Sequence, residues 1–188
     1  MMLTLPVGPA KSAPPRVETE RLVLAPPAPD DAAAIFERYA SDADVTRYVG
    51  WPRHRNLADT ESFLAFSAGQ WAQTGAGPYL IRARHDGQLL GGTGLQMDSS
   101  DLAMTGYVLA KDAWGLGYAT EALRGMIDVA RGIGVAGLYA LCHPAHRASW
   151  HVLEKCGFER DPQWTRQVEF PNLAPGVAQD VRRYALRL

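Results

Sequence analysis

The chain has few cysteines, little net charge and no long apolar run. Its 188 residues include two cysteines, Cys142 and Cys156, too few for the disulfide framework of a small secreted domain. The formal net charge is -1, so no overall basic field attracts nucleic acid or an anionic membrane. No stretch provides the roughly 20 apolar residues that a membrane-spanning helix needs. We therefore predict no nucleic-acid partner, no membrane association and a reducing, cytoplasmic location.

Length and composition predict one folded domain. Apolar residues make up 47% of the chain and charged residues 21%, as in ordinary globular proteins with a sizeable core. The stretch from Met1 to Pro15 does not resemble a secretory signal, because its only basic residue, Lys11, follows the apolar part and prolines interrupt it. We expect a flexible N-terminal arm over residues 1–16 and a single domain over 17–188.

Hydrophobic periodicity predicts an α/β (α+β) fold. Short apolar runs predict strands at about 21–25, 79–84, 89–97, 103–110 and 138–142, and a last hairpin that starts at 158 and returns over 181–188. Helical spacing predicts helices at about 30–39, 56–71, 118–131 and 147–156, with a short helix or turn at 44–48. The glycines at 91, 92 and 94 predict a bulge or a close backbone approach. The order predicts a mixed, mostly antiparallel sheet of seven strands with helices on both faces.

The most informative stretch runs from Trp114 to Thr120, between a predicted strand and the helix over 118–131. Gly115 and Gly117 allow a tight turn and a close approach to a ligand. Free N–H groups and the helix dipole then form an anion site suited to a pyrophosphate. No lysine follows the glycines, and Thr120 stands where a dinucleotide fingerprint has its third glycine. Nucleoside-triphosphate and nicotinamide binding are therefore disfavoured, while a plain tight turn without a ligand stays open on this stretch alone.

A second motif follows one predicted strand later and ends in Gly157-Phe158. Together the two motifs resemble the GNAT superfamily of acetyltransferases. Trp-Gly-Leu-Gly-Tyr-Ala, starting at Trp114, resembles its pyrophosphate motif Arg/Gln-x-x-Gly-x-Gly/Ala, with the tryptophan in place of the basic residue. Ala-Ser-Trp-His-Val-Leu-Glu-Lys-Cys-Gly-Phe resembles its second motif. Glu-Thr-Glu-Arg-Leu-Val-Leu, starting at Glu18, and the segment 41–51 look like the branch that contains ribosomal-protein N-terminal acetyltransferases. The resemblance covers about residues 17–188.

This resemblance implies a V-shaped cleft in the sheet that holds acetyl-CoA as co-substrate. Backbone groups around Val108 would orient the thioester, and Ser149 would protonate the departing thiolate or hold the water that does so. The residues implied to contact the cofactor are Val108, Leu109, Trp114, Gly115, Leu116, Gly117, Tyr118, Ala119, Thr120, His146 and Ser149. The implied reaction is acetyl transfer to a primary amine. The leading acceptor is a protein or peptide N-terminus; an amino acid, a polyamine or an aminoglycoside is also open, as are a longer acyl group and a homodimer.

The proton route departs from the family pattern. Met104 stands where this branch often has a glutamate base, and His146 stands where asparagine usually precedes the motif serine. His146, His143 or a water chain to Asp98 or Asp101 could accept the proton, although such residues also occur as ordinary loop and turn residues. The candidate catalytic residues are thus Ser149, His146 and His143.

Several alternatives remain beside this assignment. Ser149 could instead cap or pack its helix. A catalytically silent CoA-binding module is the rival function, favoured by Met104 and His146. Tyr48, Trp51 and Tyr79 are candidates for the acceptor pocket or for core packing. The cysteines and histidines at 142, 143, 146 and 156 lack the spacing of a zinc site, so we predict no metal.

Overall fold

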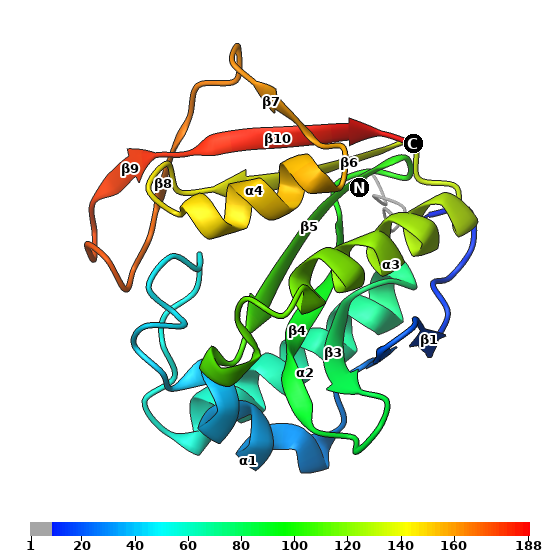
Figure 1. The fold of residues 1–188 in the computed structure, drawn as a ribbon, viewed down its shortest axis with the longest axis vertical. Helices are drawn as coiled ribbons and strands as arrows, with labels where there is room; N and C mark the ends of the chain where they lie inside the picture. Colours follow the sequence, from blue (N-terminus) through cyan, green and yellow to red (C-terminus); the bar gives the residue numbers. More distant parts are fainter. Residues whose placement is uncertain (1–8) are drawn as a thin grey trace, which may run out of the picture.

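The computed structural model describes residues 9–188, which form one twisted sheet with helices on both faces (Figure 1). Eight strands lie in the main sheet, in the order β1-β2-β3-β4-β5-β6-β10-β7. Their bounds are β1 (Val17–Glu18), β2 (Leu22–Ala25), β3 (Pro78–Ala83), β4 (Leu89–Met97), β5 (Leu102–Leu109), β6 (Gly137–Cys142), β7 (Glu159–Asp161) and β10 (Arg182–Arg187). Among the strands of residues 9–188 only β5 and β6 pair in parallel, so the predicted mixed, mostly antiparallel sheet is confirmed.

The strand count differs from the seven expected. The main sheet gains β1, because Val17 and Glu18 pair with Leu24 and Val23 of β2. A separate antiparallel pair, β8 (Gln167–Glu169) with β9 (Ala178–Asp180), lies within the segment expected to be one long hairpin connection. Both additions are two or three residues long, too short to leave a clear alternation in the sequence.

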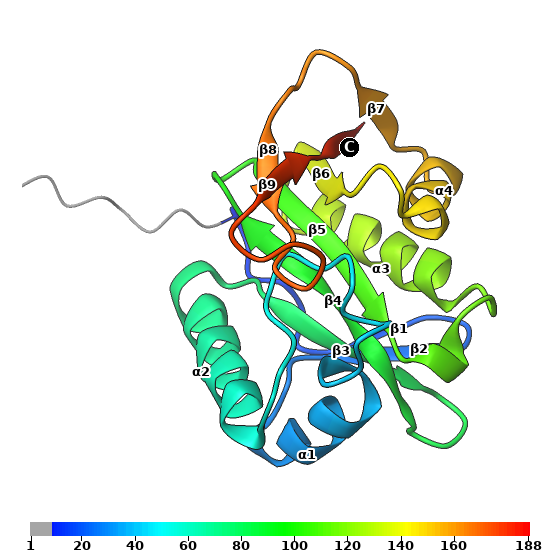
Figure 2. The same cartoon turned by 90° about the vertical axis from the view of Figure 1, so that its left-hand side faces the viewer.

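The helices cover the sheet in two layers. Figure 2 shows α1 (Ala32–Ile35) and α2 (Leu57–Thr74) on one face, with α3 (Tyr118–Gly132) and α4 (Arg147–Lys155) on the other. Short helical turns η1 (Pro29–Asp31) and η2 (Phe36–Ala40) flank α1, and η3 (Lys111–Ala113) follows β5. Asn56 caps α2 by accepting a hydrogen bond from the backbone N–H of Asp59 at 3.1 Å, as its sequence position predicts. Residues 44–48 form turns and no helix.

Two apolar clusters fix these layers. The predicted stripe of α3 packs against the sheet: Leu123, Met126 and Ala130 are fully buried. The smaller cluster lies beneath α1 and α2 and includes Ile35 and Leu80. Each fully buried aliphatic side chain of this kind contributes about 1.5–3 kcal/mol to folding, so both helical layers are held firmly against the strands that form the site.

The end of the expected flexible arm is packed on the domain. Residues 1–8 lie outside the described part, but Ala13 is buried and its N–H donates to the carbonyl oxygen of Gly75 at 2.7 Å. The hydroxyl of Tyr79 donates to the carbonyl oxygen of Pro14 at 2.6 Å. A buried tyrosine hydroxyl needs a hydrogen-bond partner, and the chain before β1 supplies it. The domain therefore includes residues that the sequence placed in the arm.

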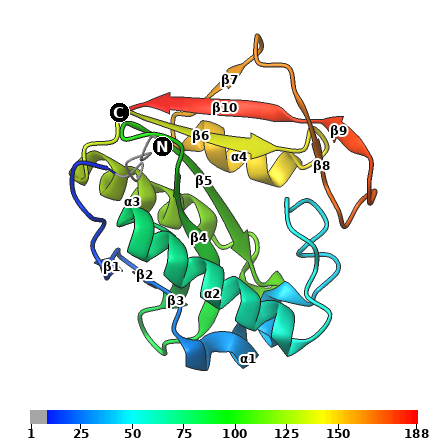
Figure 3. The ribbon, with the colours of Figure 1, turned by 180° about the vertical axis from the view of Figure 1, so that it is seen from behind.

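The sheet splits where β5 meets β6. Their pairing extends from Leu102 with Gly137 to Met104 with Tyr139 and ends there, while β5 continues to Leu109 and β6 to Cys142. Beyond this point the two strands diverge, as Figure 1 shows from one side and Figure 3 from behind. The V-shaped split implied by the family resemblance is therefore present.

The predicted close backbone approach at the β4 glycines is confirmed. A Cβ atom on Gly91 would lie 2.0 Å from the carbonyl oxygen of Val108, and one on Gly94 would lie 2.8 Å from that of Gly77. The register between β3 and β4 also shifts at Ile81 and Arg82. These glycines let β4 pack tightly between its neighbours, which sets the course of β5 toward the loop at Trp114.

Candidate active site

A cleft of about 1120 Å³ opens between the diverging strands. Its walls come from β4 and β5 on one side and from Ala140 to Cys142 of β6 on the other, and His146 and Ser149 reach it from the start of α4. The floor is therefore sheet backbone and the rim carries titratable and hydroxyl side chains. Such a concave, mainly apolar space with a few convergent polar groups is typical of a ligand site.

The loop from Trp114 to Gly117 connects β5 and η3 to the N-terminus of α3. Gly115 and Gly117 have φ angles of 74° and 83°, in the left-handed region that glycine adopts without strain. No hydrogen-bond acceptor within the described residues meets the backbone N–H groups of Gly115, Leu116 or Gly117. The first-turn N–H groups of α3, at Tyr118, Ala119 and Thr120, also lack partners within the helix. The loop thus presents a row of free donors at the positive end of the helix dipole.

Trp114 tethers this loop to the strand before it. Its indole Nε1 donates to the carbonyl oxygen of Leu109 at 2.8 Å, while the rest of the side chain is 47% exposed. The tryptophan therefore closes the turn by a neutral hydrogen bond and brings no positive charge to it. Any cation at the loop must come from elsewhere in the chain.

The register of β5 shows which backbone groups around Val108 face the cleft. Ala110 donates to Leu90 of β4, and Val108 lies opposite Gly92 on the same ladder. Because backbone groups alternate between the two neighbours of a strand, the N–H and carbonyl of Val108 face β4. The cleft edge carries instead the backbone groups of Tyr107 and Leu109, and the Leu109 carbonyl is already bound by Trp114. Val108 lines the cleft with its side chain only.

Ser149 lies in the first turn of α4, beside Tyr107 of β5. The Tyr107 hydroxyl donates to the Ser149 carbonyl oxygen at 2.6 Å and is 3.2 Å from Ser149 Oγ. Burial raises the pKa of Tyr107 well above its usual range, so this hydroxyl stays protonated at neutral pH. The pair joins the two arms of the V at the middle of the cleft.

The two candidate histidines have different surroundings. His146 lines the cleft, and burial together with the nearby charge of His143 lowers its pKa below the usual 6.5. His143 does not line the cleft: its Nδ1 accepts from the N–H of Ala145 at 3.1 Å and its Nε2 lies 3.3 Å from Gln179 Oε1. Both rings stack on Tyr48, at centroid distances of 4.8 and 5.0 Å. His146 is therefore neutral and accessible at pH 7, whereas both ring nitrogens of His143 are engaged.

The wide end of the cleft is aromatic. Tyr48 and Trp51 line it. Tyr79 borders the cleft but is fully buried in the larger core cluster, the core packing that the sequence left open as its alternative. Tyr48 and Trp51 are joined by residues from η2, α2 and the β8 region: Tyr39, Phe63, Phe66 and Phe170. The charged and titratable side chains that line this end include Arg53, His54, Arg55, Asp59 and Glu169. Burial lowers the pKa of His54, although Asp59 opposes that shift.

Asn172 joins the two walls of this wide end. Its Nδ2 donates to the carbonyl oxygens of Thr46 and Trp51 at 2.7 and 2.9 Å, and its Oδ1 accepts from the N–H of Arg53 at 2.7 Å. These bonds span at least 119 residues of sequence. They connect the 41–56 segment to the chain between β8 and β9. These two segments lie side by side in Figure 3.

The other proton acceptors weighed from the sequence lie away from the cleft. Met104 lines it and offers no proton acceptor. Asp98 accepts from the Tyr139 hydroxyl and Asp101 from Ser99 Oγ, at the closed end of the V. Within residues 9–188, no group of three His, Cys, Asp or Glu side chains is arranged to hold a metal ion.

Sequence reasoning missed Tyr107, His54, Asn172 and Glu169. Tyr107 stands next to the glycine of a motif strand, so its proximity to the serine helix could have been inferred from strand alternation. His54 and Asn172 stand in irregular segments and Glu169 ends the three-residue strand β8, where no periodicity long enough to read shows the direction of a side chain.

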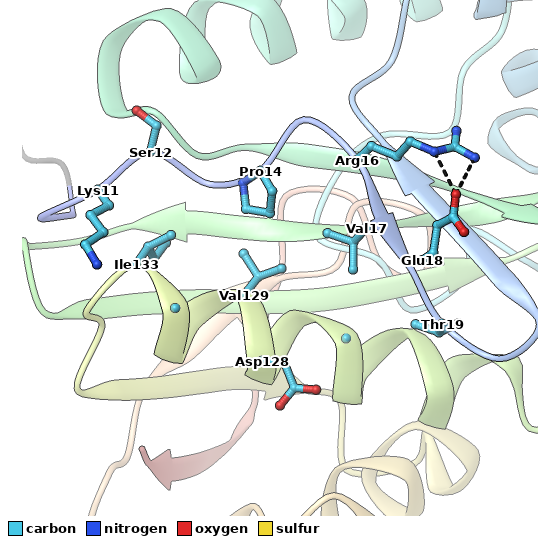
Figure 4. A pocket seen from close by; sticks show the side chains of 12 residues that line it. Lys11, Ser12, Pro14, Arg16, Val17, Glu18, Thr19, Asp128, Val129 and Ile133 are labelled. Carbon is cyan, nitrogen blue, oxygen red and sulfur yellow. Dashed lines mark hydrogen bonds and ion pairs between the residues drawn. The ribbon is translucent and has the colours of Figure 1, made fainter.

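A second hollow, of about 460 Å³, lies between residues 11–19 and α3 (Figure 4). Most of its charged groups are paired locally: Arg16 pairs with Glu18 at 2.8 Å, and Asp128 with Arg131 at 3.6 Å, while Lys11 also lines the hollow. It brings no convergent set of free polar groups together, and the V-shaped cleft is therefore the candidate active site.

Comparison with known proteins agrees with this geometry. The acetyltransferase (GNAT) domain family matches residues 21–159, and the chain belongs to that family. It is 26% identical over 175 residues, 92% of its length, to the uncharacterized N-acetyltransferase YoaA of Bacillus subtilis, 96% of which is covered.

Two solved structures share the fold. One is RimL, a ribosomal L7/L12 alpha-N-protein acetyltransferase in complex with coenzyme A, at TM-score 0.79 and 19% identity over 92% of this chain and 98% of that one. The other is the microcin C7 self-immunity acetyltransferase MccE in complex with acetyl-CoA and AMP, at TM-score 0.78 and 20% identity over 90% and 94%.

The protein is thus an acetyl-CoA-dependent acetyltransferase, and acetyl-CoA is its co-substrate. The site fits that molecule, because the glycine loop offers free N–H groups for phosphate and the β5 edge offers unpaired backbone for an amide-bearing chain. No helix among residues 9–188 has the length and hydrophobicity to cross a membrane.

Proposed function

We propose that the enzyme transfers acetyl to a primary amine, with a protein or peptide N-terminus as the leading acceptor. The observation that carries this proposal is the cleft between β5 and β6, lined by His146 and Ser149 and by an aromatic space. The glycine loop with its free N–H groups follows the end of β5, outside the residues that line the cleft. Acetyl-CoA would supply the acetyl group from the narrow side. Residues Trp114 to Thr120 would hold its pyrophosphate, and the free backbone of Tyr107 and Leu109 would hold the pantetheine arm.

The acceptor side suits a cationic amine that becomes neutral before it reacts. The carboxylates of Asp59 and Glu169 would attract the ammonium form locally, beside the guanidinium groups of Arg53 and Arg55 that line the same space. An α-amino group has a pKa near about 8, so little help is needed to deprotonate it at pH 7, in contrast to lysine near about 10.4. The space is also large enough for the first residues of a chain. RimL, which shares the fold, is described as acting on an alpha-amino group of a ribosomal protein.

His146 would accept the proton that the amine loses. It is the neutral imidazole on the cleft wall, it stands within the same α4 motif as Ser149, and its lowered pKa keeps its ring nitrogen free at pH 7. Ser149 Oγ would deliver a proton to the leaving sulfur, with the Tyr107 hydroxyl holding the serine in place. The Met104 side chain can neither accept the proton of the amine nor donate one to the sulfur.

The experiment is a calorimetric titration with acetyl-CoA, followed in the same sample by thiol release with a panel of N-terminal peptides, amino acids, polyamines and aminoglycosides. Fastest release with peptides supports the proposed acceptor. Release that is fastest with a small amine contradicts that acceptor and retains the reaction. Binding without release from any amine supports a silent CoA-binding module.

A further inference from the structure

Arg21 lies against the glycine loop, although it precedes it by about a hundred residues. Its Nη1 donates to the carbonyl oxygen of Leu116 at 2.9 Å, and its guanidinium carbon lies 4.6 Å from the centre of the Tyr118 ring. A Cβ atom on Gly117 would lie 3.3 Å from its Nη2. Arg21 thus contacts the loop at the three residues where the strand connection becomes α3.

The side chain is held in this place from behind. Its Nε donates to Glu121 Oε2 at 2.7 Å, and its backbone N–H donates to Glu121 Oε1 at the same distance. Thr19 Oγ1 adds a third hydrogen bond to that carboxylate, at 2.6 Å. Burial alone would raise the pKa of Glu121, but the bonds from Thr19 and Arg21 outweigh it and lower the pKa. The carboxylate therefore stays charged and orients the guanidinium.

One nitrogen of this guanidinium, Nη2, is unused. Nη2 makes no hydrogen bond with any of residues 9–188, and the side chain is 43% exposed. It lies beside Gly117, in the loop whose N–H groups are also free. The tryptophan at 114 brings no charge to the loop, so the guanidinium supplies the cation that the usual basic residue of this motif would have supplied.

We propose that Arg21 binds a phosphate of the CoA nucleotide and so determines the preference for the full cofactor over a shorter thioester. The proposal rests on the proposed function, because it assumes that this loop receives the pyrophosphate. A planar guanidinium with one free nitrogen is well suited to a phosphate oxygen. The pyrophosphate and the 3′-phosphate share this chemistry, and the comparison of acetyl-CoA with its dephospho form distinguishes them.

The test measures calorimetric affinity for acetyl-CoA and its dephospho form, and kcat/KM for acetyl-pantetheine, which has no phosphate. Arg21→Ala is expected to weaken acetyl-CoA binding about tenfold, the effect of losing one charge-assisted hydrogen bond. The dependence of that affinity on salt concentration is not expected to become steeper. The kcat/KM of Arg21→Ala with acetyl-pantetheine is expected to stay within about twofold of wild type. Arg21→Lys is expected to recover part of the loss, since it keeps the charge without the fork. An equal loss with the dephospho form assigns the pyrophosphate; a loss confined to acetyl-CoA assigns the 3′-phosphate.

Glu121→Gln separates phosphate binding from mere support of the loop. If Arg21 binds phosphate, Glu121→Gln leaves acetyl-CoA affinity within about twofold of wild type, because glutamine keeps one side-chain oxygen that can accept from Arg21 and removes the competing negative charge. If the pair only supports the loop, Glu121→Gln weakens binding as much as Arg21→Ala does and lowers Tm with it. Arg131→Ala removes an equal charge from the far end of α3 and is the matched control.

The outcomes that overturn the proposal are distinct from failure of the proposed function. Equal losses with acetyl-CoA and acetyl-pantetheine, or no loss with Arg21→Ala while wild type binds acetyl-CoA, refute the role of Arg21 alone. Absence of acetyl-CoA binding by the wild type refutes the proposed site itself.

Discussion

The hydroxyl of Tyr107 lies 2.6 Å from the carbonyl oxygen of Ser149 and 3.2 Å from its Oγ. One residue is in β5 and the other in α4, so this contact links the two arms of the sheet across the split. It also gives the serine hydroxyl a fixed neighbour at the point where the cleft narrows. A positioning role for Tyr107 follows, beside the proposed proton transfer by Ser149.

Substitution of these two residues should lower turnover and leave binding intact. Ser149→Ala is expected to lower kcat about a hundredfold, the lower end of the effect of a positioned acid. Tyr107→Phe is expected to lower it about tenfold, the value of one hydrogen bond to a reacting group. Thiol release measures kcat and calorimetry measures the Kd of acetyl-CoA. Tyr139→Phe, which loses a hydrogen bond to Asp98 outside the cleft, is the control, and unchanged turnover in Ser149→Ala would remove the serine from the mechanism.

The acid side of the pH–rate profile should report His146. Its pKa is below 6.5 because burial disfavours the imidazolium and His143 adds repulsion. Acidification protonates the base, so the limb of the kcat/KM profile that reports His146 should lie below pH 6.5. The limb that reports deprotonation of the acceptor amine should lie at higher pH and should move when the acceptor is changed. His146→Gln should abolish the lower limb.

His143→Gln is the matched variant for this profile. Because it removes one cause of the lowered pKa of His146, the acid limb should move toward higher pH with kcat retained at the plateau. If His143→Gln loses the acid limb of the pH–rate profile and His146→Gln keeps it, His143 and not His146 is the proton acceptor.

The left-handed glycine at 117 should tolerate no side chain. Gly117→Ala is expected to destabilise the fold by about 1 kcal/mol, the lower end of the cost of that backbone conformation in other residues. Gly117→Glu should abolish acetyl-CoA binding, because its carboxylate would stand where phosphate is expected. Calorimetry and thermal unfolding measure both effects.

Gly132→Ala provides the comparison, since that glycine lies at the far end of α3 with no atom within 4 Å of an added Cβ. It should bind acetyl-CoA as wild type does. Intact binding by Gly117→Glu would show that the loop does not hold the cofactor.

Removal of the Asn172 bridge should affect the acceptor alone. Asn172→Ala loses three hydrogen bonds between the walls of the wide end. We expect KM for the amine to rise about fivefold, KM for acetyl-CoA to stay constant, and Tm to fall by about 3 °C per kcal/mol lost. Gln167→Ala, which loses only its bond to Asp180 in the same region, should keep the KM of wild type. A rise in KM for acetyl-CoA as well would show that the bridge supports the whole cleft.

Prediction from the sequence succeeded where the determinants are local. The α3 stripe, the Asn56 cap and the Gly115–Gly117 turn depend on residues within one or two turns of each other, so propensity and spacing reveal them. It could not resolve which of the backbone groups around Val108 face the cleft and which face β4. Strand alternation answers that only after the partner and register of β5 are known.

The sequence by itself determined the order of elements, the phosphate-type loop and the serine helix, because each is a short-range pattern of glycine, apolar and capping residues. Tertiary structure decided where β5 and β6 part, which histidine reaches the cleft, and that Arg21 and Asn172 cross about a hundred residues to reach the loop and the wide end. Those arrangements depend on packing and hydrogen bonds between distant segments. No local pattern encodes such contacts, since their energy exists only once the sheet has brought the segments together.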